Sequence, residues 1–299
     1  MTASTAVSVV VVTYNAVPYV EPCLDSVRDH PTVVVDHGST DGTLELVREA
    51  FPDVRVLEQE NRGLAAGWNA GMRAAPARYF LLLNADAWVL GDAVGQLIAF
   101  ADAHPDAAVI GPRLRNPDGS LQRSVRGFPT LWRLATEYFF LRKLAPRSQL
   151  LNSFYGGGFD HGSVREVEFV MGACMLVRCA AADSVGLLDE DFFIFSEETD
   201  WCYRFRQAGW KVLFYPGAEA VHVGAASHGG RMLRENVRGT LRFLVKHRGL
   251  REAERARRLL ALSLRLRGLI FRGERGRQYR SAAAWLRSGP TGKLLDSPK

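Results

Sequence analysis

The sequence has no apolar run close to the roughly 20 residues that a membrane-spanning helix requires, which excludes an integral membrane protein of the helical type. Cysteine is scarce, with four in 299 residues, and the spacing of the four fits neither a zinc site nor a C-x-x-C redox motif. We therefore expect free thiols in a reducing cytoplasm. No Lys or Arg precedes the short apolar stretch near the N-terminus, so we expect no secretory signal.

Two glycine-rich phosphate-binding motifs are also missing. The chain contains no G-x-x-x-x-G-K-[ST] loop, and Thr13-Tyr14-Asn15 follows the first apolar run where a dinucleotide-binding domain would place G-x-G-x-x-G. A nucleotidyltransferase on a related sheet would need a glycine-rich loop with Arg at the same place. The sequence therefore argues against these three classes of nucleotide-binding enzyme.

The first hundred residues show alternating strand and helix patterns. Four apolar runs, typical of strands buried on both faces of a parallel sheet, occur at 9–12, 33–35, 54–57 and 79–83. Helical segments are expected between and after them, at 18–25, 42–50, 63–75 and 91–104. This pattern predicts an α/β fold with a doubly wound, mostly parallel sheet. Further along we expect helices at 130–145 and 197–208 and strands at 167–177 and 211–215.

The charge is unevenly distributed. The net charge is +6, but residues 231–299 hold nineteen Lys and Arg against five Asp and Glu, so the rest of the chain is net negative. This region contains no recognised nucleic-acid module, so no nucleic-acid partner is expected. Its apolar residues recur at helical spacing: Leu259, Leu262, Leu266, Leu269 and Ile270. Such a basic amphipathic stripe either packs on the preceding domain or lies on an anionic membrane surface.

Polar side chains follow three of the four predicted strands. They are Thr13, Tyr14 and Asn15 after the first, Asp36 after the second, and Asn84 and Asp86 after the fourth. In open α/β sheets, ligands bind beyond the carboxyl ends of the strands. The sequence therefore predicts a binding site at this edge.

Several motifs in this order resemble the family 2 glycosyltransferases, inverting enzymes with the nucleotide-sugar-binding GT-A fold. The matching segments are VVTYN (11–15), VDHGSTDGT (35–43), NRGLAAGWNAG (61–71), LLNAD (82–86), GACMLVR (172–178), EETDWC (197–202) and the segment around His222. Within the family, the pattern is most similar to bacterial rhamnosyltransferase-like enzymes. The resemblance implies a catalytic domain over 1–230, with a nucleotide-sugar half (1–112) and an acceptor half (113–230). A basic helical extension would follow over 231–299.

The resemblance also implies roles for individual residues near the nucleotide. Asp36 would accept a hydrogen bond from the base or ribose, with Thr13, Tyr14 and Asn15 lining the same pocket, and Arg62 would suit a diphosphate. Taken alone, residues 38–42 read as a simple turn, and Asn61-Arg62-Gly63 as a loop before a helix.

A divalent cation is the implied cofactor. Where the family usually carries Asp-x-Asp, this chain has Asn84 and Asp86, so one carboxylate remains to hold the ion. In relatives, a histidine matching His222 reaches the same metal, and Pro216, Gly224 and Ser227 keep the family spacing. Without the motif, His222 would read as a core histidine. Mn²⁺ and Mg²⁺ both fit an Asp and His pair.

The acidic cluster at 197–200 offers the candidate catalytic base. Transfer with inversion needs a single carboxylate to take the acceptor proton. Glu198 matches the family's catalytic position, and Asp200 is a second candidate. The two lie about 200° apart around a helix, so only one of them can point into the site. Acids in a first helical turn also occur for helix-dipole reasons alone.

Together these observations predict a metal-dependent inverting glycosyltransferase of cell-wall or polysaccharide assembly. It would move a rhamnose-like or other hexose from a dTDP- or UDP-sugar to a hydroxyl of a lipid-linked or glycan acceptor. The expected location is the cytoplasm, with an option of peripheral attachment to the inner face of the membrane. A non-catalytic sugar-nucleotide-binding protein on the same fold is the alternative.

Overall fold

The computed structural model describes residues 6–224 and 232–296, and its contacts divide the chain into two compact units. The first unit comprises Met1–Val125, Asp160–Asp191 and Glu197–Ser227, and the second comprises Arg126–Phe159, Phe192–Ser196 and His228–Lys299. The catalytic domain expected over 1–230, with halves 1–112 and 113–230, stays a prediction. By its contacts, the structure groups 126–159 and 192–196 with the C-terminal helices.

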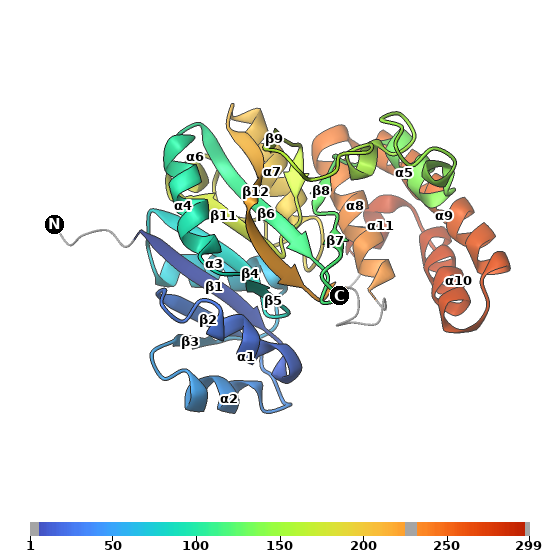
Figure 1. Cartoon of the computed structure of the whole chain (residues 1–299). Coiled ribbons are helices and arrows are strands. Elements are labelled where there is room, and N and C mark those ends of the chain that lie inside the picture. Colours follow the sequence, from blue (N-terminus) through green and yellow to red (C-terminus); the bar gives the residue numbers. More distant parts are fainter. Residues whose placement is uncertain (1–5, 225–231, 297–299) are drawn as a thin grey trace. The chain divides into compact units, whose positions relative to one another are not determined.

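A mostly parallel sheet forms the centre of the first unit (Figure 1). Its strands are β1 (Val7–Thr13), β2 (Thr32–Asp36), β3 (Arg55–Glu58), β4 (Tyr79–Asn84), β5 (Ala87–Val89), β6 (Ala107–Arg115), β7 (Leu121–Gln122), β9 (Arg165–Glu166), β11 (Cys174–Arg178) and β12 (Lys211–His222). The main path runs β3-β2-β1-β4-β11-β6-β12-β5, with β7 on β6 and β9 on β12. Strand β11 runs antiparallel between β4 and β6. Two short strands lie outside this path, β8 (Val125–Arg126) and β10 (Phe169–Val170).

Helices cover both faces of this sheet. They are α1 (Val17–Asp25), α2 (Thr43–Ala50), α3 (Leu64–Ala74), α4 (Ala93–Ala103), α6 (Cys179–Val185) and α7 (Glu197–Gln207). Alternate residues of β1 point to opposite faces, as the strand pleat requires. Val7, Val9 and Val11 belong to a core shared with α1, α2 and α4. Val10 faces α3 on the other side.

A close approach joins α3 to β1. A Cβ added at Gly71 would lie 2.3 Å from Cγ1 of Val10, and one at Gly67 would lie 2.8 Å from the Val12 methyl groups. Only glycine leaves room for the helix backbone at this distance from the sheet.

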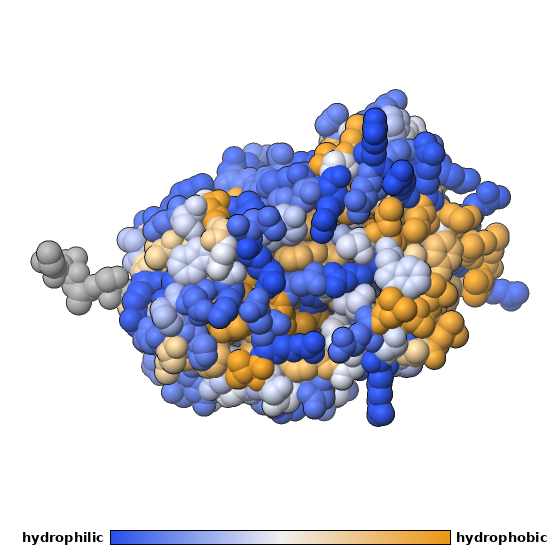
Figure 2. Space-filling view, turned by 90° about the horizontal axis from the view of Figure 1, so that it is seen from above, coloured by the Kyte–Doolittle hydropathy of each residue, from blue (hydrophilic) through white to orange (hydrophobic). Residues whose placement is uncertain are grey.

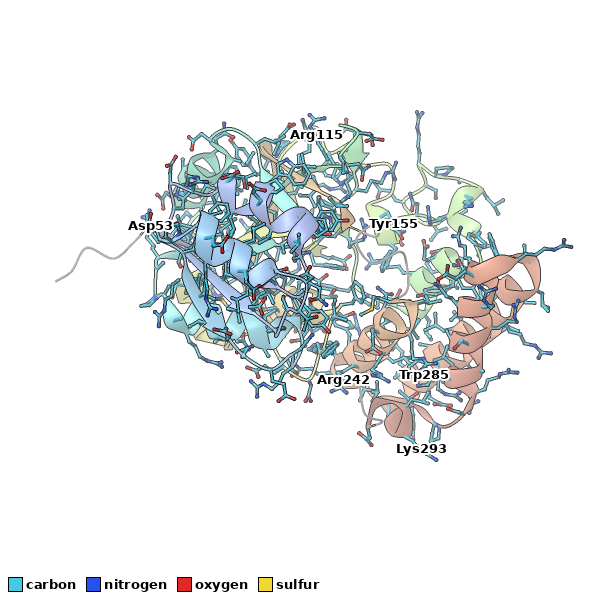
Figure 3. The ribbon with its side chains drawn as sticks, turned by 90° about the horizontal axis from the view of Figure 1, so that it is seen from below. Asp53, Arg115, Tyr155, Arg242, Trp285 and Lys293 are labelled. Atoms are coloured by element: carbon cyan, nitrogen blue, oxygen red, sulfur yellow. The ribbon has the colours of Figure 1, made fainter. Side chains whose placement is uncertain are left out.

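The second unit is helical. It contains α5 (Leu131–Tyr138), the 3₁₀ turns η1 (Leu141–Lys143) and η2 (Ser153–Tyr155), α8 (Leu233–Arg248), α9 (Leu250–Ile270), α10 (Gly273–Arg287) and α11 (Thr291–Asp296). Arg267 on α9 donates to the backbone oxygens of Tyr138 and Glu137, both at 2.8 Å, and its guanidinium lies 3.9 Å from the centre of the Phe140 ring. The ring of Trp285, labelled in Figure 3, has its centre 5.5 Å from the guanidinium carbon of Arg238.

An acid ties α9 to α11 within the same unit. Thr291 donates to Glu254 through both its backbone N–H and its hydroxyl. Hydrogen bonds from Arg257, reinforced by those from Thr291, lower the pKa of Glu254 to about 2. The carboxylate therefore stays ionised over the physiological range and continues to accept these bonds.

The predicted elements of the first hundred residues are confirmed, with boundaries that shift by a few residues. Two later expectations need correction. The predicted strand 167–177 is two strands, β10 and β11, and the predicted helix 130–145 stops at Tyr138 and resumes as a 3₁₀ turn. In the described ranges 6–224 and 232–296, no helix is both long enough and apolar enough to cross a membrane.

The contact between α3 and β1 makes a stability prediction. We expect Gly71→Ala to lower the free energy of unfolding by about 1–3 kcal/mol, because the methyl group overpacks against Val10. Urea unfolding followed by tryptophan fluorescence measures this. Gly292→Ala in α11 is the matched control, because nothing lies within 4 Å of its added Cβ. We expect the control to be neutral or stabilising. Equal midpoints for the two variants would contradict the close packing.

Candidate functional site

The carboxyl ends of three parallel strands meet at one edge of the sheet. Thr13 at the end of β1 pairs with Asp36 at the end of β2, and Val12 pairs with Asn84 at the end of β4. The polar residues that follow the three strands are therefore neighbours, as the sequence predicted.

Asp36 is the centre of a hydrogen-bond network at this edge. Its side chain is buried, with 1% of its surface exposed. It accepts bonds from the Thr13 hydroxyl at 2.7 Å, from the Ser39 hydroxyl at 2.6 Å, and from the backbone N–H groups of Gly38 and Ser39. Asp36 thus organises the loop after β2, and a nucleotide donor would have to share oxygens that already accept four bonds.

The loops after β1 and β2 are bonded to each other. Asn15, in a left-handed backbone conformation, accepts from the Thr40 N–H at 2.8 Å, and its own N–H donates to the Ser39 hydroxyl. The hydroxyl of Thr43 accepts from the Ala16 N–H. Tyr14 is 57% exposed. Residues 38–43 therefore form a loop whose polar side chains hold a fixed backbone shape.

His37 belongs to the motif at 35–43, and no role was predicted for it from the sequence. It lies directly after β2. The ring nitrogen Nε2 of His37 lies 3.0 Å from Nε2 of Gln59, and the backbone N–H of His37 donates to the Thr13 carbonyl. Burial lowers the pKa of His37, against the opposing effect of a hydrogen bond with Asn61. The imidazole is therefore biased toward its neutral form at this edge of the sheet.

Arg62 lies in the loop before α3 and pairs with an acid. Its guanidinium lies 3.1 Å from Glu190, whose other oxygen accepts from Asn69. The Arg62 side chain is 62% exposed, so the pair is solvated. A hydrogen bond from Asn69 lowers the pKa of Glu190, with smaller contributions from the charges of Arg62 and Arg73. The predicted diphosphate contact would require Arg62 to exchange this partner.

Asp86 and His222 are neighbours, although 136 positions separate them in the sequence. Strand β5 pairs antiparallel with β12 and sets His222 opposite Ala87. Oδ1 of Asp86 lies 3.4 Å from Nε2 of His222, and Oδ2 accepts from the N–H of Gly224 at 3.1 Å. Both side chains are largely buried, at 14% and 7% exposure. Ser227, also part of the predicted pattern, lies outside the described residues.

A carboxylate oxygen and an imidazole nitrogen this close are donors suited to Mn²⁺ or Mg²⁺. Their separation of 3.4 Å compares with roughly 3 Å between two neighbouring ligands of a six-coordinate ion bound at about 2.1 Å. In the part of the chain that the structure describes, three or more acidic, His or Cys side chains do not gather into one site. The residues present therefore fit a cation whose other ligands come from a substrate and water.

Glu198 lies next to Gly172, which is close to the same edge of the sheet. The Asn84 N–H donates to the carbonyl of Ala173, so the residues before β11 lie beside the end of β4. A Cβ placed on Gly172 would lie 2.9 Å from the Trp68 ring and 3.6 Å from Cβ of Glu198. The start of α7 is therefore next to the end of β4 and the start of β11.

The three acids at the start of α7 have different surroundings. Glu197 is 3% exposed, and burial, with a contribution from the charge of Glu198, raises its pKa well above the usual range. Asp200 is 0% exposed and accepts from Arg204 at 2.8 Å. Arg204 also bonds the carbonyls of 185–187, so Asp200 serves to hold this turn. Glu198 alone of the three is partly exposed. This geometry favours Glu198 over Asp200 as the group that meets a substrate.

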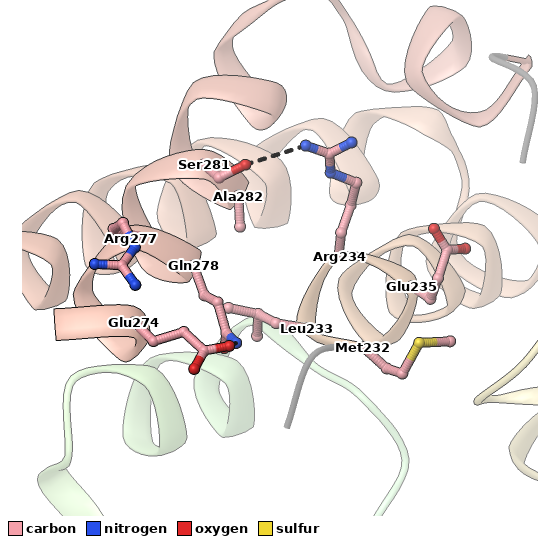
Figure 4. A pocket seen from close by; sticks show the side chains of 9 residues that line it. All are labelled: Met232, Leu233, Arg234, Glu235, Glu274, Arg277, Gln278, Ser281 and Ala282. Atoms are coloured by element: carbon pink, nitrogen blue, oxygen red, sulfur yellow. Dashed lines mark hydrogen bonds between the residues drawn. The ribbon is translucent and has the colours of Figure 1, made fainter. Parts of the chain in front are cut away.

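A separate cavity of about 500 Å³ lies within the second unit, between the start of α8 and α10 (Figure 4). Arg234 crosses it and donates to the Ser281 hydroxyl. Glu235, Glu274 and Arg277 also line it. None of the predicted site residues does, so the cavity is distinct from the sheet edge.

The chain belongs to the family described as glycosyl transferase family 2, whose model matches residues 8–191. It is 32% identical over 238 residues to the N-acetylglucosaminyl-diphospho-decaprenol L-rhamnosyltransferase of Mycobacterium tuberculosis, covering 74% of this chain and 77% of the relative. The predicted family and the rhamnosyltransferase-like pattern are therefore confirmed.

Solved structures confirm the predicted GT-A fold. The mannosyltransferase PcManGT of Pyrobaculum calidifontis, in complex with GDP-Man and Mn²⁺, superposes with a TM-score of 0.56 at 18% identity, covering 98% of this chain and 84% of that one. GalNAc-T7, crystallised with UDP, GalNAc and Mn²⁺, has a TM-score of 0.58 at 16% identity, covering 82% of this chain and 48% of that one.

Sequence reasoning missed three side chains at this site. Trp68 lies within the motif at 61–71, and Gln59 lies two residues before it. Their positions in or next to a matched motif could have indicated that they belong to the site. Gln122 contacts His222 at 2.7 Å from 100 positions away. No pattern in the sequence connects these two residues.

Proposed function

We propose that the protein is a metal-dependent inverting glycosyltransferase that moves a hexose from a nucleoside-diphosphate sugar to a hydroxyl acceptor. One observation carries the proposal. A carboxylate and imidazole pair, Asp86 and His222, and the partly exposed residue Glu198 are positioned by strands and a helix that meet at the carboxyl edge of one sheet.

The donor would bind across the ends of β1, β2 and β4. Thr13, Tyr14, Asn15 and Asp36 belong to the two bonded loops that would receive the nucleoside, and Asn84 lies beside them. Asp86 and His222 would hold the cation, which supplies positive charge to the departing diphosphate. The charge of Arg62 acts on His37 at this edge, so Arg62 would assist the diphosphate after leaving Glu190.

Glu198 would act as the general base. It would take the proton from the acceptor hydroxyl as the oxygen attacks the anomeric carbon and the bond to the diphosphate breaks. A single base without a covalent glycosyl intermediate gives inversion. The buried neighbours Glu197 and Asp200 lack access to an acceptor.

The donor and acceptor are proposed by analogy with the mycobacterial relative, whose name describes rhamnosyl transfer to a diphospho-decaprenol-linked N-acetylglucosamine. A rhamnose-like sugar and a lipid-linked acceptor follow from that analogy. We propose dTDP or UDP as the carrier, with another hexose and a glycan acceptor as the alternatives. The alternative, a non-catalytic sugar-nucleotide-binding protein, draws on Asn84 in place of an acid.

The first prediction tests the metal and the donor together. We expect the melting temperature of the wild type to rise with a dTDP- or UDP-sugar, and to rise further when Mn²⁺ is added, because a ligand that binds the folded state stabilises it. Asp86→Asn should abolish the Mn²⁺-dependent part and sugar transfer while retaining the fold. GDP-sugars serve as the comparison donor. Full transfer by the wild type in excess EDTA would overturn the metal dependence.

The second prediction separates the two acids. Glu198→Gln should leave donor binding unchanged and lower turnover by roughly 10² to 10⁴, the range for losing a general base. Asp200→Asn should instead lower the melting temperature, because it weakens a buried pair with Arg204. Transfer assays and thermal unfolding on both variants give the ranking. A larger turnover loss in Asp200→Asn at unchanged stability would assign the base to Asp200, and full turnover in Glu198→Gln would favour the non-catalytic alternative.

The membrane part of the proposal concerns one face of α9. The buried side of this helix includes Ala256, Leu260 and Leu264. Four members of the predicted stripe are instead exposed, namely Leu262 (53%), Leu266 (42%), Leu269 (74%) and Ile270 (71%). Figure 2 shows hydrophobic side chains gathered on the surface of the second unit, at the right of the view.

Basic residues continue the same exposed face. Arg251, Arg255, Arg258 and Arg265 are exposed and follow the stripe at helical spacing. Apolar burial combined with roughly 1 kcal/mol per basic residue near anionic lipid favours a membrane interface. A lipid-linked acceptor would make this location useful, because such a substrate stays in the bilayer.

The third prediction tests the exposed face in the full-length protein. We expect the wild type to sediment with anionic phospholipid vesicles at low salt, and less so in about 0.5 M salt, because screening weakens the Arg contribution. Replacing Leu266, Leu269 and Ile270 together by Ser should reduce binding by roughly tenfold or more. Leu144→Ser with Leu150→Ser is the control, since these leucines are also exposed, at 78% and 66%. Equal binding by both variants, or no binding by the wild type, would exclude this surface.

A further inference from the structure

Gln122 contacts His222 through both polar atoms of its amide. It is the last residue of β7, which pairs with the C-terminal part of β6, and β6 in turn pairs with β12. Its Oε1 lies 2.7 Å from Nδ1 of the His222 ring, and its Nε2 lies 2.9 Å from the backbone oxygen of the same residue. One side chain therefore contacts both the ring and the main chain of His222.

The surroundings determine which end of the Gln122 amide faces the ring. A backbone oxygen can only accept a hydrogen bond, so the group 2.9 Å from the His222 carbonyl is the NH₂ group. The same NH₂ group donates to Oδ1 of Asn116 at 2.9 Å. Turning the amide over would place two oxygens at this distance without a proton between them. Oε1 therefore faces the ring, and because it can only accept, Nδ1 must carry a hydrogen.

This arrangement decides what His222 presents to Asp86. With the hydrogen on Nδ1, the neutral form of the ring has its lone pair on Nε2, the nitrogen that lies 3.4 Å from Oδ1 of Asp86. That distance exceeds the usual range of about 2.7–3.2 Å for an N–H···O bond. In that form Nε2 and the carboxylate oxygen are both electron-pair donors, and their separation suits two ligands of one cation.

Gly224 closes the other side of the ring. It has a positive φ of 68°, and a Cβ there would lie 3.1 Å from Cε1 of His222. Its N–H also fixes Oδ2 of Asp86. Both members of the pair are thus held by groups other than each other.

We propose that Gln122 is a positioning residue that holds His222 in the Nδ1–H tautomer, so that Nε2 and Asp86 together bind a divalent cation. This inference deepens the proposed function, on whose metal it rests. Outer partners of metal-bound histidines commonly fix the tautomer in this way, and their loss weakens metal binding by about 10- to 100-fold.

The first measurement reads the tautomer without metal. Two-bond ¹H–¹⁵N correlation spectra of the full chain distinguish the two neutral tautomers and the imidazolium, and His222→Gln assigns the signal. We expect the Nδ1–H form in the wild type and a loss of that preference in Gln122→Met, which keeps length and removes both polar atoms. The Nε2–H form or the imidazolium in the wild type would overturn the proposal.

The second measurement is the affinity for Mn²⁺ alone, followed by the electron paramagnetic resonance of the free ion. We expect Gln122→Met to weaken binding by about 10- to 100-fold, and to have no further effect in a His222→Ala background. Gln122→Glu keeps an acceptor for Nδ1–H but replaces the donor to the His222 carbonyl by an oxygen, so it should recover only part of the affinity. Leu121→Met on the same strand is the control and should match the wild type; thermal unfolding verifies that each variant folds.

The outcomes distinguish the positioning role of Gln122 from metal binding by Asp86 and His222. Equal Mn²⁺ affinity for the wild type and Gln122→Met would overturn the positioning role and leave the metal site standing. A wild type that shows the Nδ1–H tautomer but binds no Mn²⁺ would overturn the metal assignment, and the positioning role with it. Glu198→Gln activity tests the transferase proposal independently of both results.

Discussion

The parallel pairing of β2, β1 and β4 is the constraint on which the site depends. Because parallel strands end at the same edge, their registers bring Thr13, Asp36 and Asn84 together from three separate stretches of chain. Strand β11, inserted antiparallel beside β4, begins at this edge and brings the neighbourhood of Glu198 to it. Strand β12 ends there against β5 and delivers His222 to Asp86. Without the register of these strands, none of the motif residues would share a site.

A second theme is that most polar groups at the edge already have protein partners. Asp36 accepts four hydrogen bonds, Asn15 bonds to the neighbouring loop, and Arg62 pairs with Glu190. These bonds keep the backbone of the loops in one conformation before any ligand arrives. A rigid loop presents its backbone groups to a nucleotide at a small entropic cost. Turn formation by this motif is therefore compatible with the proposed nucleotide binding, and the two interpretations of the sequence do not exclude each other.

Burial and neighbouring charges distinguish the three acids at the start of α7. Glu197, Glu198 and Asp200 are chemically similar and adjacent in sequence, but burial and Arg204 assign them different states. Burial favours the neutral form of Glu197, the salt bridge holds Asp200 in the protein interior, and Glu198 keeps access to the surface. Helical geometry alone predicts that Glu198 and Asp200 diverge. It does not predict which one is buried.

The sequence by itself determined the family, the βαβ order of the first hundred residues and the strand ends that carry Thr13, Asp36 and Asp86, because local hydrophobic periodicity and contiguous motifs encode all of these. It also predicted the amphipathic C-terminal stripe. Only the tertiary structure decided that this stripe is the exposed face of α9, since a helix with apolar residues on two sides does not reveal which side is buried. The assignment of 126–159 to the helical unit, and the contact of Gln122 with His222, likewise arise from pairings between distant segments. Such pairings depend on strand register and packing, which leave no periodic signal in a single sequence.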